Sequence, residues 1–244
     1  MNTRDQEWLL RDKYGGVESA AYLSDIEALK KGEHVSYLIG WVPFLGCKIG
    51  LESRPLIPRP ETEWWTEQVI RHVHTRKDTQ VDCLDLFTGS GCIGIAILVH
   101  ESRSHVTFGD INSAYLKTVE MNILRNHIDT SRAKISETDV FSKIDGLFDI
   151  ITANPPYIDI KKRNNLEHEL GVEPASALYA NDAGLQYIQL FLNSLKKHLK
   201  QGGKAFMEFD SGQEKAIGNI AKKAGLTITF FNDQYGVPRF LMAE

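Results

Sequence analysis

Residues 148–157 read Phe148-Asp149-Ile150-Ile151-Thr152-Ala153-Asn154-Pro155-Pro156-Tyr157. The first six form a short run rich in β-branched and aromatic side chains, which is typical of a buried strand. Proline has no N–H to donate to a sheet, so the double proline ends this strand abruptly. Each proline also favours extended geometry in the residue before it. We therefore predict that the chain leaves the sheet at Asn154 and that the carbonyl groups of Asn154 and Pro155 face a cavity.

Such an arrangement suits a planar –NH2 group. The side-chain amide of Asn154 and a neighbouring backbone carbonyl form a rigid pair of hydrogen-bond acceptors, and Tyr157 offers a ring for stacking. An amide or exocyclic amine is a poor nucleophile because its lone pair is delocalised. Two acceptors that take both N–H hydrogens position the nitrogen and stabilise the charge it gains in a transition state. Taken alone, the same residues also fit an ordinary Asn-Pro turn at the end of a strand.

Strands and helices alternate on both sides of this stretch, which predicts an α/β fold with a mainly parallel sheet covered on both faces. Seven strands are expected at residues 81–87, 105–111, 133–139, 148–153, 204–210, 227–232 and 237–243. Helices are expected at residues 61–75 and 213–224, two more are expected to begin at residues 91 and 113, and another is expected to end at residue 200. A loop is expected at residues 158–181. The last two strands lie too close together for a helical crossover, so we expect them to form an antiparallel hairpin at the edge of the sheet.

The region before the sheet divides into two predicted parts. Residues 1–31 are charged and helical, and residues 32–60 form a linker in which 35–51 fold as a hairpin that turns around Pro43 and Gly46. Three prolines then fix an extended segment ahead of the helix at 61–75: Pro55, Pro58 and Pro60. The main domain is expected to span residues 61–244.

Composition limits the classes of protein that fit. The chain has 244 residues, 42% of them hydrophobic, and a formal net charge of −4, which leaves no overall basic surface for nucleic acid. Its three cysteines form no CxxC pair, so we expect buried, reduced thiols in a cytoplasmic protein. The N-terminus has no apolar signal core, no run approaches the about 18 apolar residues of a membrane span, and the eight scattered histidines suggest no metal site.

A cofactor site is predicted where the first strand of the sheet meets its helix. The connection reads Leu84-Asp85-Leu86-Phe87-Thr88-Gly89-Ser90-Gly91-Cys92-Ile93-Gly94. In a doubly wound sheet, ligands bind at the carboxyl ends of the strands, and glycines in this turn let the backbone approach them. Asp85 would repel a pyrophosphate and attract a cationic amino-acid group.

Two further acids are predicted to end the next two strands. Asp110 follows Gly91 by 19 residues, where an acid binds ribose hydroxyls, and Asp139 precedes Val140 and Phe141, which suit a purine ring. Each aspartate alone could be a turn or helix cap. Together with Asn154 they indicate a ligand with a ribose, a purine, an amino-acid tail and an electrophile, which describes S-adenosylmethionine. The expected cofactor-binding residues are Asp85, Phe87, Thr88, Gly89, Gly91, Asp110, Ile111, Asp139, Val140 and Asn154.

From residue 32 to 244 the chain resembles the HemK/PrmC-type glutamine methyltransferases, which methylate the glutamine of the Gly-Gly-Gln loop in peptide chain release factors. The resemblance rests on five segments: Gly32-Glu33-His34-Val35-Ser36-Tyr37-Leu38-Ile39-Gly40, Leu56-Ile57-Pro58-Arg59-Pro60-Glu61-Thr62-Glu63, residues 85–94, Asn154-Pro155-Pro156-Tyr157, and Glu173-Pro174 with Ala177-Leu178. It implies a Rossmann-like, S-adenosylmethionine-dependent methyltransferase whose catalytic domain spans residues 61–244.

The resemblance also implies roles for the residues of the motif. Asn154 and the Pro155 carbonyl would hold the substrate glutamine and Tyr157 would pack on it, with Pro156 completing the substrate site. Pro58, Glu61 and Thr62 would lie near the cofactor, and no acid, base or metal is assigned. Two features depart from the family. Phe87 stands where a small residue is common, and only 31 residues precede the linker, where the family carries a larger helical domain that grips the release factor.

Two other classes of function remain open from sequence. The Asn-Pro-Pro-Tyr motif also resembles that of enzymes that methylate amino groups of nucleic acid, and Lys161-Lys162-Arg163 lies beside it. Such an enzyme needs a basic groove and a flipped base, so nucleic acid is the less favoured substrate, alongside another protein such as a ribosomal protein. A cofactor-binding scaffold without catalysis would have no need for Asn154 together with the cofactor acids.

Overall fold

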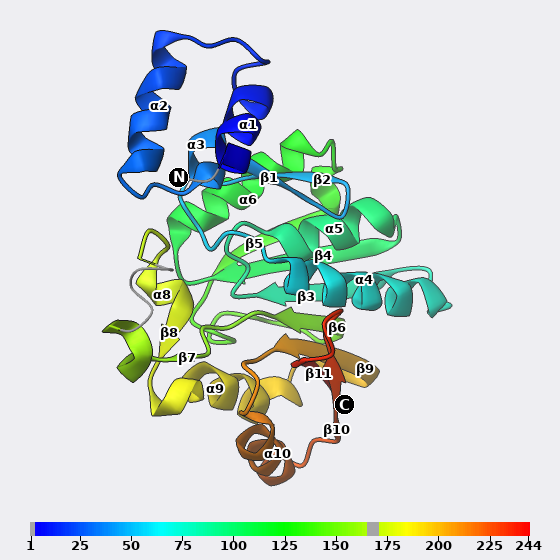
Figure 1. The fold of residues 1–244 in the computed structure, drawn as a ribbon. Coiled ribbons are helices and arrows are strands. Elements are labelled where there is room, and N and C mark those ends of the chain that lie inside the picture. The colour runs from blue at the N-terminus through cyan, green and yellow to red at the C-terminus, as the bar shows by residue number, and fades with distance from the viewer. Residues whose placement is uncertain (1–2, 165–170) are drawn as a thin grey trace.

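The structure, a computed structural model, describes residues 3–164 and 171–244. Its centre is a seven-stranded sheet in the order β10-β11-β9-β6-β3-β4-β5 (Figure 1). The strands are β3 (Val81–Leu86), β4 (Ser104–Asp110), β5 (Ala133–Glu137), β6 (Phe148–Ala153), β9 (Leu199–Glu208), β10 (Ile228–Asn232) and β11 (Pro238–Ala243). The predicted seven-stranded α/β fold is confirmed. Residues 1–2 of the predicted helical segment and 165–170 of the predicted loop lie outside the described residues.

Helices cover both faces of this sheet (Figure 1). The helices are α4 (Pro60–Thr75), α5 (Cys92–His100), α6 (Ser113–Arg125), α9 (Gln186–Leu195) and α10 (Glu214–Lys223). Successive residues of a strand point to opposite faces. Cys83 accordingly packs in the cluster that includes residues of α4, α5 and α6, whereas Leu84 packs in the cluster that includes residues of α9 and α10. Burial of both faces explains why the central strands read as nearly continuous apolar runs.

The strand order places a switch point at the middle of the sheet. From β3 the chain builds outward through β4 to β5, and it then returns to β6 on the other side of β3. All of these neighbours are parallel, so the carboxyl ends of β3 and β6 lie together. Connections diverge there and leave a crevice, which is where doubly wound sheets bind ligands.

The predicted hairpin at the sheet edge is formed by β10 and β11, which pair antiparallel. Strand β11 also pairs antiparallel with β9, with Phe240 opposite Glu208. It therefore lies one position inside the sheet and leaves β10 as the outermost strand. Strand β11, the last strand of the sheet in sequence, is thus the one that runs opposite to the other six.

The N-terminal region contains three helices and a small hairpin. These are α1 (Thr3–Asp12), α2 (Ala20–Lys30), α3 (Val35–Ile39), β1 (Trp41–Phe44) and β2 (Cys47–Gly50). The hairpin predicted at 35–51 is thus confined to residues 41–50, and its first part is helical. His34 caps α3 by accepting the backbone N–H of Ser36, and Gly40 ends it in a left-handed conformation (φ 88°). These signals outweigh the alternation of apolar residues.

Two further boundaries differ from the prediction. The predicted loop 158–181 contains a short parallel pair, β7 (Ile158–Asp159) with β8 (Tyr179–Ala180), and a helical turn, α8 (Ala175–Leu178). Strand β9 begins at Leu199 rather than at residue 204, because a shift in its register with β6 accommodates Gly202 and Gly203 inside the strand. Three short 3-10 turns complete the described chain: η1 (Thr130–Arg132), η2 (Ile160–Lys162) and η3 (Asp182–Gly184).

The three cysteines are buried and free, as predicted. Burial raises the pKa of the Cys47 thiol to about 11 and that of Cys83 to about 12, so both stay protonated at neutral pH. Within residues 3–164 and 171–244, no group of three or more His, Cys, Asp or Glu side chains is placed to hold a metal ion. In the same residues, no helix combines the length and the apolar character needed to cross a bilayer.

Candidate active site

The turn after β3 depends on residues with positive φ. Gly89 and Gly91 have φ values of 53° and 80°, and a Cβ on Gly91 would lie 3.0 Å from a methyl group of Val119. Phe87 precedes them with φ 54°, which is unusual for a residue with a large side chain. Backbone strain of this kind is concentrated at functional sites, and this turn borders a crevice at the carboxyl edge of the sheet.

Asp85 supports this turn from beneath. It is fully buried, and its carboxylate accepts hydrogen bonds from the Thr88 hydroxyl (2.6 Å), the Thr152 hydroxyl (2.8 Å) and the Gly94 N–H (3.2 Å). Burial raises its pKa to about 6. The sequence predicted that this carboxylate faces the cofactor, whereas the structure turns it toward donors of the protein itself.

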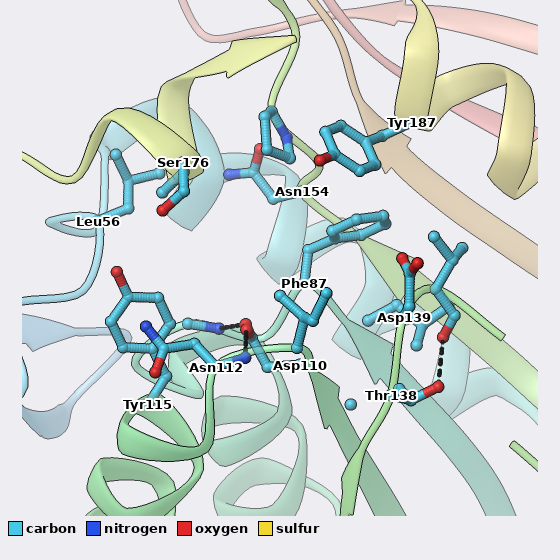
Figure 2. A pocket seen from close by; sticks show the side chains of 17 residues that line it. Leu56, Phe87, Asp110, Asn112, Tyr115, Thr138, Asp139, Asn154, Ser176 and Tyr187 are labelled. Atoms are coloured by element: carbon cyan, nitrogen blue, oxygen red, sulfur yellow. Dashed lines mark hydrogen bonds between the residues drawn. The ribbon is translucent and has the colours of Figure 1, made fainter. Parts of the chain in front are cut away.

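Above the turn lies a cavity of about 770 Å³ at the carboxyl ends of β3, β4 and β6 (Figure 2). Eight residues predicted from sequence line it: Phe87, Gly89, Asp110, Ile111, Asp139, Val140, Asn154 and Pro156. Three other predicted cofactor residues, Asp85, Thr88 and Gly91, lie outside its lining and shape the turn. Most of the predicted site is therefore brought together in one place.

Asp110 is fixed on one wall of this cavity (Figure 2). Its carboxylate accepts the backbone N–H groups of Gly89 and Asn112, both at 2.9 Å. The side chain is largely buried, and desolvation raises its pKa even though these hydrogen bonds favour the charged form. A carboxylate held in this way is a preorganised acceptor for hydroxyl groups of a ligand.

The charges around this cavity select the kind of ligand that it binds. Among the described residues that line it, two are carboxylates, Asp110 and Asp139, and none is lysine or arginine. A phosphate-bearing nucleotide would meet these acids without a compensating cation. A nucleoside with a positive charge suits the same walls.

A second cavity, of about 440 Å³, adjoins the first. Pro155 and Tyr157 line it, and it shares Leu56, Asn154 and Ala177 with the larger cavity. Asn154 is half-buried at the point where the two cavities meet. Asn154 can therefore contact a group bound in either cavity.

The wall of the second cavity is held by Glu173, which the sequence singled out. Its buried carboxylate accepts the Ile57 N–H at 3.0 Å and pairs with the guanidinium of Arg59. The proline-rich segment is thereby tied to the chain that leads into α8, and Leu56 from the first and Ala177 from the second both line the cavity. Pro58 and Glu61 take no part in the lining of either cavity, whereas Thr62 reaches Asn154.

Several lining residues were not predicted: Leu56, Leu86, Gly109, Asn112, Tyr115, Thr138, Ser176, Ala177 and Tyr187. Tyr187 packs edge-to-face against Phe87, with ring centroids 5.7 Å apart (Figure 2). Leu86, Gly109, Asn112 and Thr138 adjoin predicted residues in sequence, so extending each strand end by one or two positions would have found them. Tyr187 and Ser176 come from distant segments, and no local pattern marks them.

This sheet order, with a glycine turn and an Asn-Pro-Pro-Tyr motif at the switch point, defines a Rossmann-like methyltransferase, and the Methyltransferase small domain family matches residues 65–182. A release factor glutamine methyltransferase of Thermodesulfovibrio yellowstonii is 33% identical over 90% of this chain and 79% of its own length. One of Lactococcus lactis is 30% identical over 97% of this chain and 86% of its own. The chain belongs to the release factor glutamine methyltransferase family.

A solved structure supports the fold independently. A methyltransferase from Pyrococcus furiosus superposes with a TM-score of 0.57 at 17% identity, covering 92% of this chain and 95% of its own. At this identity the similarity concerns the fold alone, and it extends over nearly the whole length of both chains.

Proposed function

We propose that this protein transfers a methyl group from S-adenosylmethionine to the side-chain amide nitrogen (N5) of a protein glutamine, the one in the Gly-Gly-Gln loop of a peptide chain release factor. The position of Asn154 between the two cavities carries this proposal. The names of the relatives favour the release factor over nucleic acid or a ribosomal protein as substrate.

The larger cavity fits S-adenosylmethionine. In this proposal Asp110 accepts the ribose hydroxyls, and Val140 and Ile111 offer apolar surface for the purine. Gly89 has no side chain, which lets the amino-acid tail approach the turn. Carboxylates without a lining cation suit the sulfonium charge. When bound there, this cofactor supplies an electrophilic methyl group.

The smaller cavity takes the substrate amide. The Asn154 side-chain oxygen and the Pro155 carbonyl accept its two N–H groups, which holds the nitrogen toward the first cavity and favours the positive charge it gains. Tyr157 forms the wall against which the planar amide packs. Once the nitrogen carries the methyl group it is positively charged and acidic, and it releases a proton to water. We therefore assign no base and no metal.

We also propose how the remaining parts serve this reaction. Residues 61–244 form the catalytic domain, and residues 32–60 supply one wall of the substrate cavity through Leu56. Residues 1–31 form a separate N-terminal segment, whose described part contains α1 and α2. The partner is a cytoplasmic release factor, since translation termination takes place in that compartment.

The test is transfer from labelled S-adenosylmethionine to a purified, unmethylated release factor, with mass spectrometry to locate the methyl group. We expect labelling of the Gly-Gly-Gln glutamine, and none in a release factor whose glutamine is replaced by alanine. Absence of transfer by enzyme that binds S-adenosylhomocysteine in calorimetry would reject this substrate.

A further inference from the structure

The geometry points to Glu208 as a positioning residue that, through Thr62 and Tyr157, fixes the direction in which the Asn154 amide faces. This inference rests on the proposed function, because it concerns how Asn154 presents an acceptor to an amide substrate. Glu208 belongs to neither cavity lining and was not among the residues predicted from sequence.

The fold brings Glu208 level with the catalytic motif. Strands β6 and β9 run parallel with Ala153 opposite Met207, so the next residue of each, Asn154 and Glu208, lies at the same carboxyl edge of the sheet. Glu208 is 1% exposed. Burying a carboxylate to this extent is costly unless hydrogen-bond donors surround it.

Three donors surround the carboxylate. One oxygen accepts the Thr62 hydroxyl and the Trp65 indole N–H, both at 2.6 Å, and the other accepts the Tyr157 hydroxyl at 2.8 Å. An ionised carboxylate has no proton to donate, so each of these groups must give its own. The nearby Arg239, which pairs with Asp233, adds a favourable positive charge.

This arrangement determines the orientation of the Asn154 amide. A threonine hydroxyl has one hydrogen, and Thr62 gives it to Glu208, so toward Asn154 the Thr62 oxygen can only accept. Asn154 meets it with its Nδ2 at 3.4 Å. The reverse orientation would place two acceptors against each other. The Asn154 oxygen is thus reserved for the N–H group of a substrate.

The other end of the motif is fixed by the same carboxylate. The Tyr157 hydroxyl donates to Glu208, while its backbone carbonyl accepts from the Gln213 side chain at 3.0 Å. Tyr157 is therefore held at both its hydroxyl and its main chain. One buried carboxylate orients the acceptor at the start of the motif and the aromatic wall at its end.

The test compares variants of Thr62, because this residue links Glu208 to the Asn154 amide and can be replaced without removing a charge. We expect Thr62→Val to lower kcat about 100-fold, because the amide loses the partner that fixes it, and to leave the affinity for S-adenosylhomocysteine within about twofold. Thr62→Ser keeps the hydroxyl and should restore kcat. Thr66→Val is the matched control, since Thr66 is equally buried one turn along α4 and donates only to the Thr62 carbonyl.

Glu208→Gln extends the test to the carboxylate itself. Its amide donates a hydrogen, which permits Thr62 to donate toward Asn154, so we expect a similar loss of kcat and little further loss in the Thr62→Val/Glu208→Gln double variant. The Thr62 variants decide the inference even if Glu208→Gln fails to fold.

The outcomes separate the inference from the function on which it rests. A wild-type enzyme that labels no glutamine refutes the proposed function. If the wild-type enzyme labels the glutamine and Thr62→Val has an unchanged kcat, the positioning role of Glu208 is overturned and the proposed function stands. An equal loss in Thr62→Ser and Thr62→Val, or in Thr66→Val, would also overturn it by showing that packing rather than the hydroxyl matters.

Discussion

Gly184 lies so close to Tyr157 that a Cβ atom on it would sit 1.9 Å from the Tyr157 carbonyl oxygen. Its φ of +85° is a second reason for glycine at this position. The 3-10 turn that contains Gly184 therefore limits where the Asn-Pro-Pro-Tyr segment can lie.

We expect Gly184→Ala to displace the motif and to lower both the unfolding free energy and kcat. The clash is with backbone, so the loss of stability should exceed the about 1 kcal/mol of a left-handed alanine alone. Urea denaturation and steady-state kinetics measure the two effects. Gly236→Ala is the control, because Gly236 has a similar φ of +79° but open space around it. Equal destabilisation by both changes would contradict the close contact.

Asn154→Ala should strongly reduce the rate of transfer while leaving the cofactor bound. In the proposed reaction the amide contacts the nitrogen that is methylated, so its loss should cost about 100- to 1000-fold in kcat. Calorimetry with S-adenosylhomocysteine should give an affinity within a few-fold of wild type. A variant with wild-type kcat and KM would remove Asn154 from the reaction.

Asp110→Asn should act on the cofactor instead. The N–H groups of Gly89 and Asn112 meet different oxygens of the carboxylate, and asparagine replaces one of these oxygens with an NH2 donor. The proposed acceptor for the ribose hydroxyls also loses its charge. We expect the dissociation constant of S-adenosylhomocysteine to rise about tenfold or more.

Burial raises the pKa of Asp110, so the affinity of wild type should fall as the pH is lowered toward that pKa. The asparagine variant lacks this titration, and its affinity should change less over the same range. Identical pH profiles would show that Asp110 does not titrate at the site.

The buried Asp85 predicts a dependence of stability on pH. Its pKa is about 6 in the folded protein, above the ordinary value of 3.8, so the folded state binds more protons between these pH values. The contribution of Asp85 to the unfolding free energy therefore decreases as pH rises through this window, by about 3 kcal/mol for roughly two pKa units. Asp85→Asn should lose that decrease in denaturation experiments at a series of pH values.

Asp82→Asn is the control for this titration, since Asp82 lies three residues earlier on the same strand. Burial opposes its ionisation, but hydrogen bonds from Lys200 and Gln80 prevail and lower its pKa. Its contribution to stability is present above the ordinary pKa and is lost as pH falls, so its removal should change the slope in the opposite sense. If the unfolding free energies of the two variants change with pH at the same slope, the raised pKa of Asp85 in the folded protein is rejected.

Phe87 offers a comparison of two replacements at a strained position. Its φ of 54° favours glycine, so Phe87→Gly should be more stable than Phe87→Ala by about 1 kcal/mol, the reverse of the order in ordinary strands and helices. Both lose the ring contact with Tyr187, which cancels in the comparison. Unfolding free energies measure the difference, and a more stable alanine variant would argue against the left-handed backbone.

The sequence predicted the sheet well because periodicity and strand spacing report directly on which residues are buried. It also located Asp110 and Asn154, since residues that end parallel strands must meet at one edge. The direction of Asp85 could not be predicted in this way. Its neighbours in space, Thr88, Thr152 and Gly94, belong to a turn, another strand and a helix, and only their packing decides whether the carboxylate faces them or the cavity.

Glu208 illustrates the same limit from the other side. It ends a strand, as the predicted acids do. However, it is enclosed by β11, the neighbouring strand in the sheet, and by helix α4, which supplies Thr62 and Trp65. A strand end in sequence therefore identifies candidates for a site, whereas tertiary packing decides which of them touch a ligand and which organise the residues that do.

The position of β11 has a consequence for the order in which the site is assembled during synthesis. Glu208 pairs across the sheet with Phe240, a residue that the ribosome adds after every other part of the site. Until that strand inserts beside β9, the carboxylate that orients Thr62 and Tyr157 lies on an open sheet edge, where water competes for its hydrogen bonds. The nascent chain can bury its glycine turn and central strands earlier, since their contacts are closer in sequence. Competence for transfer should thus arise late and in a single step, when the emerging chain supplies Phe240.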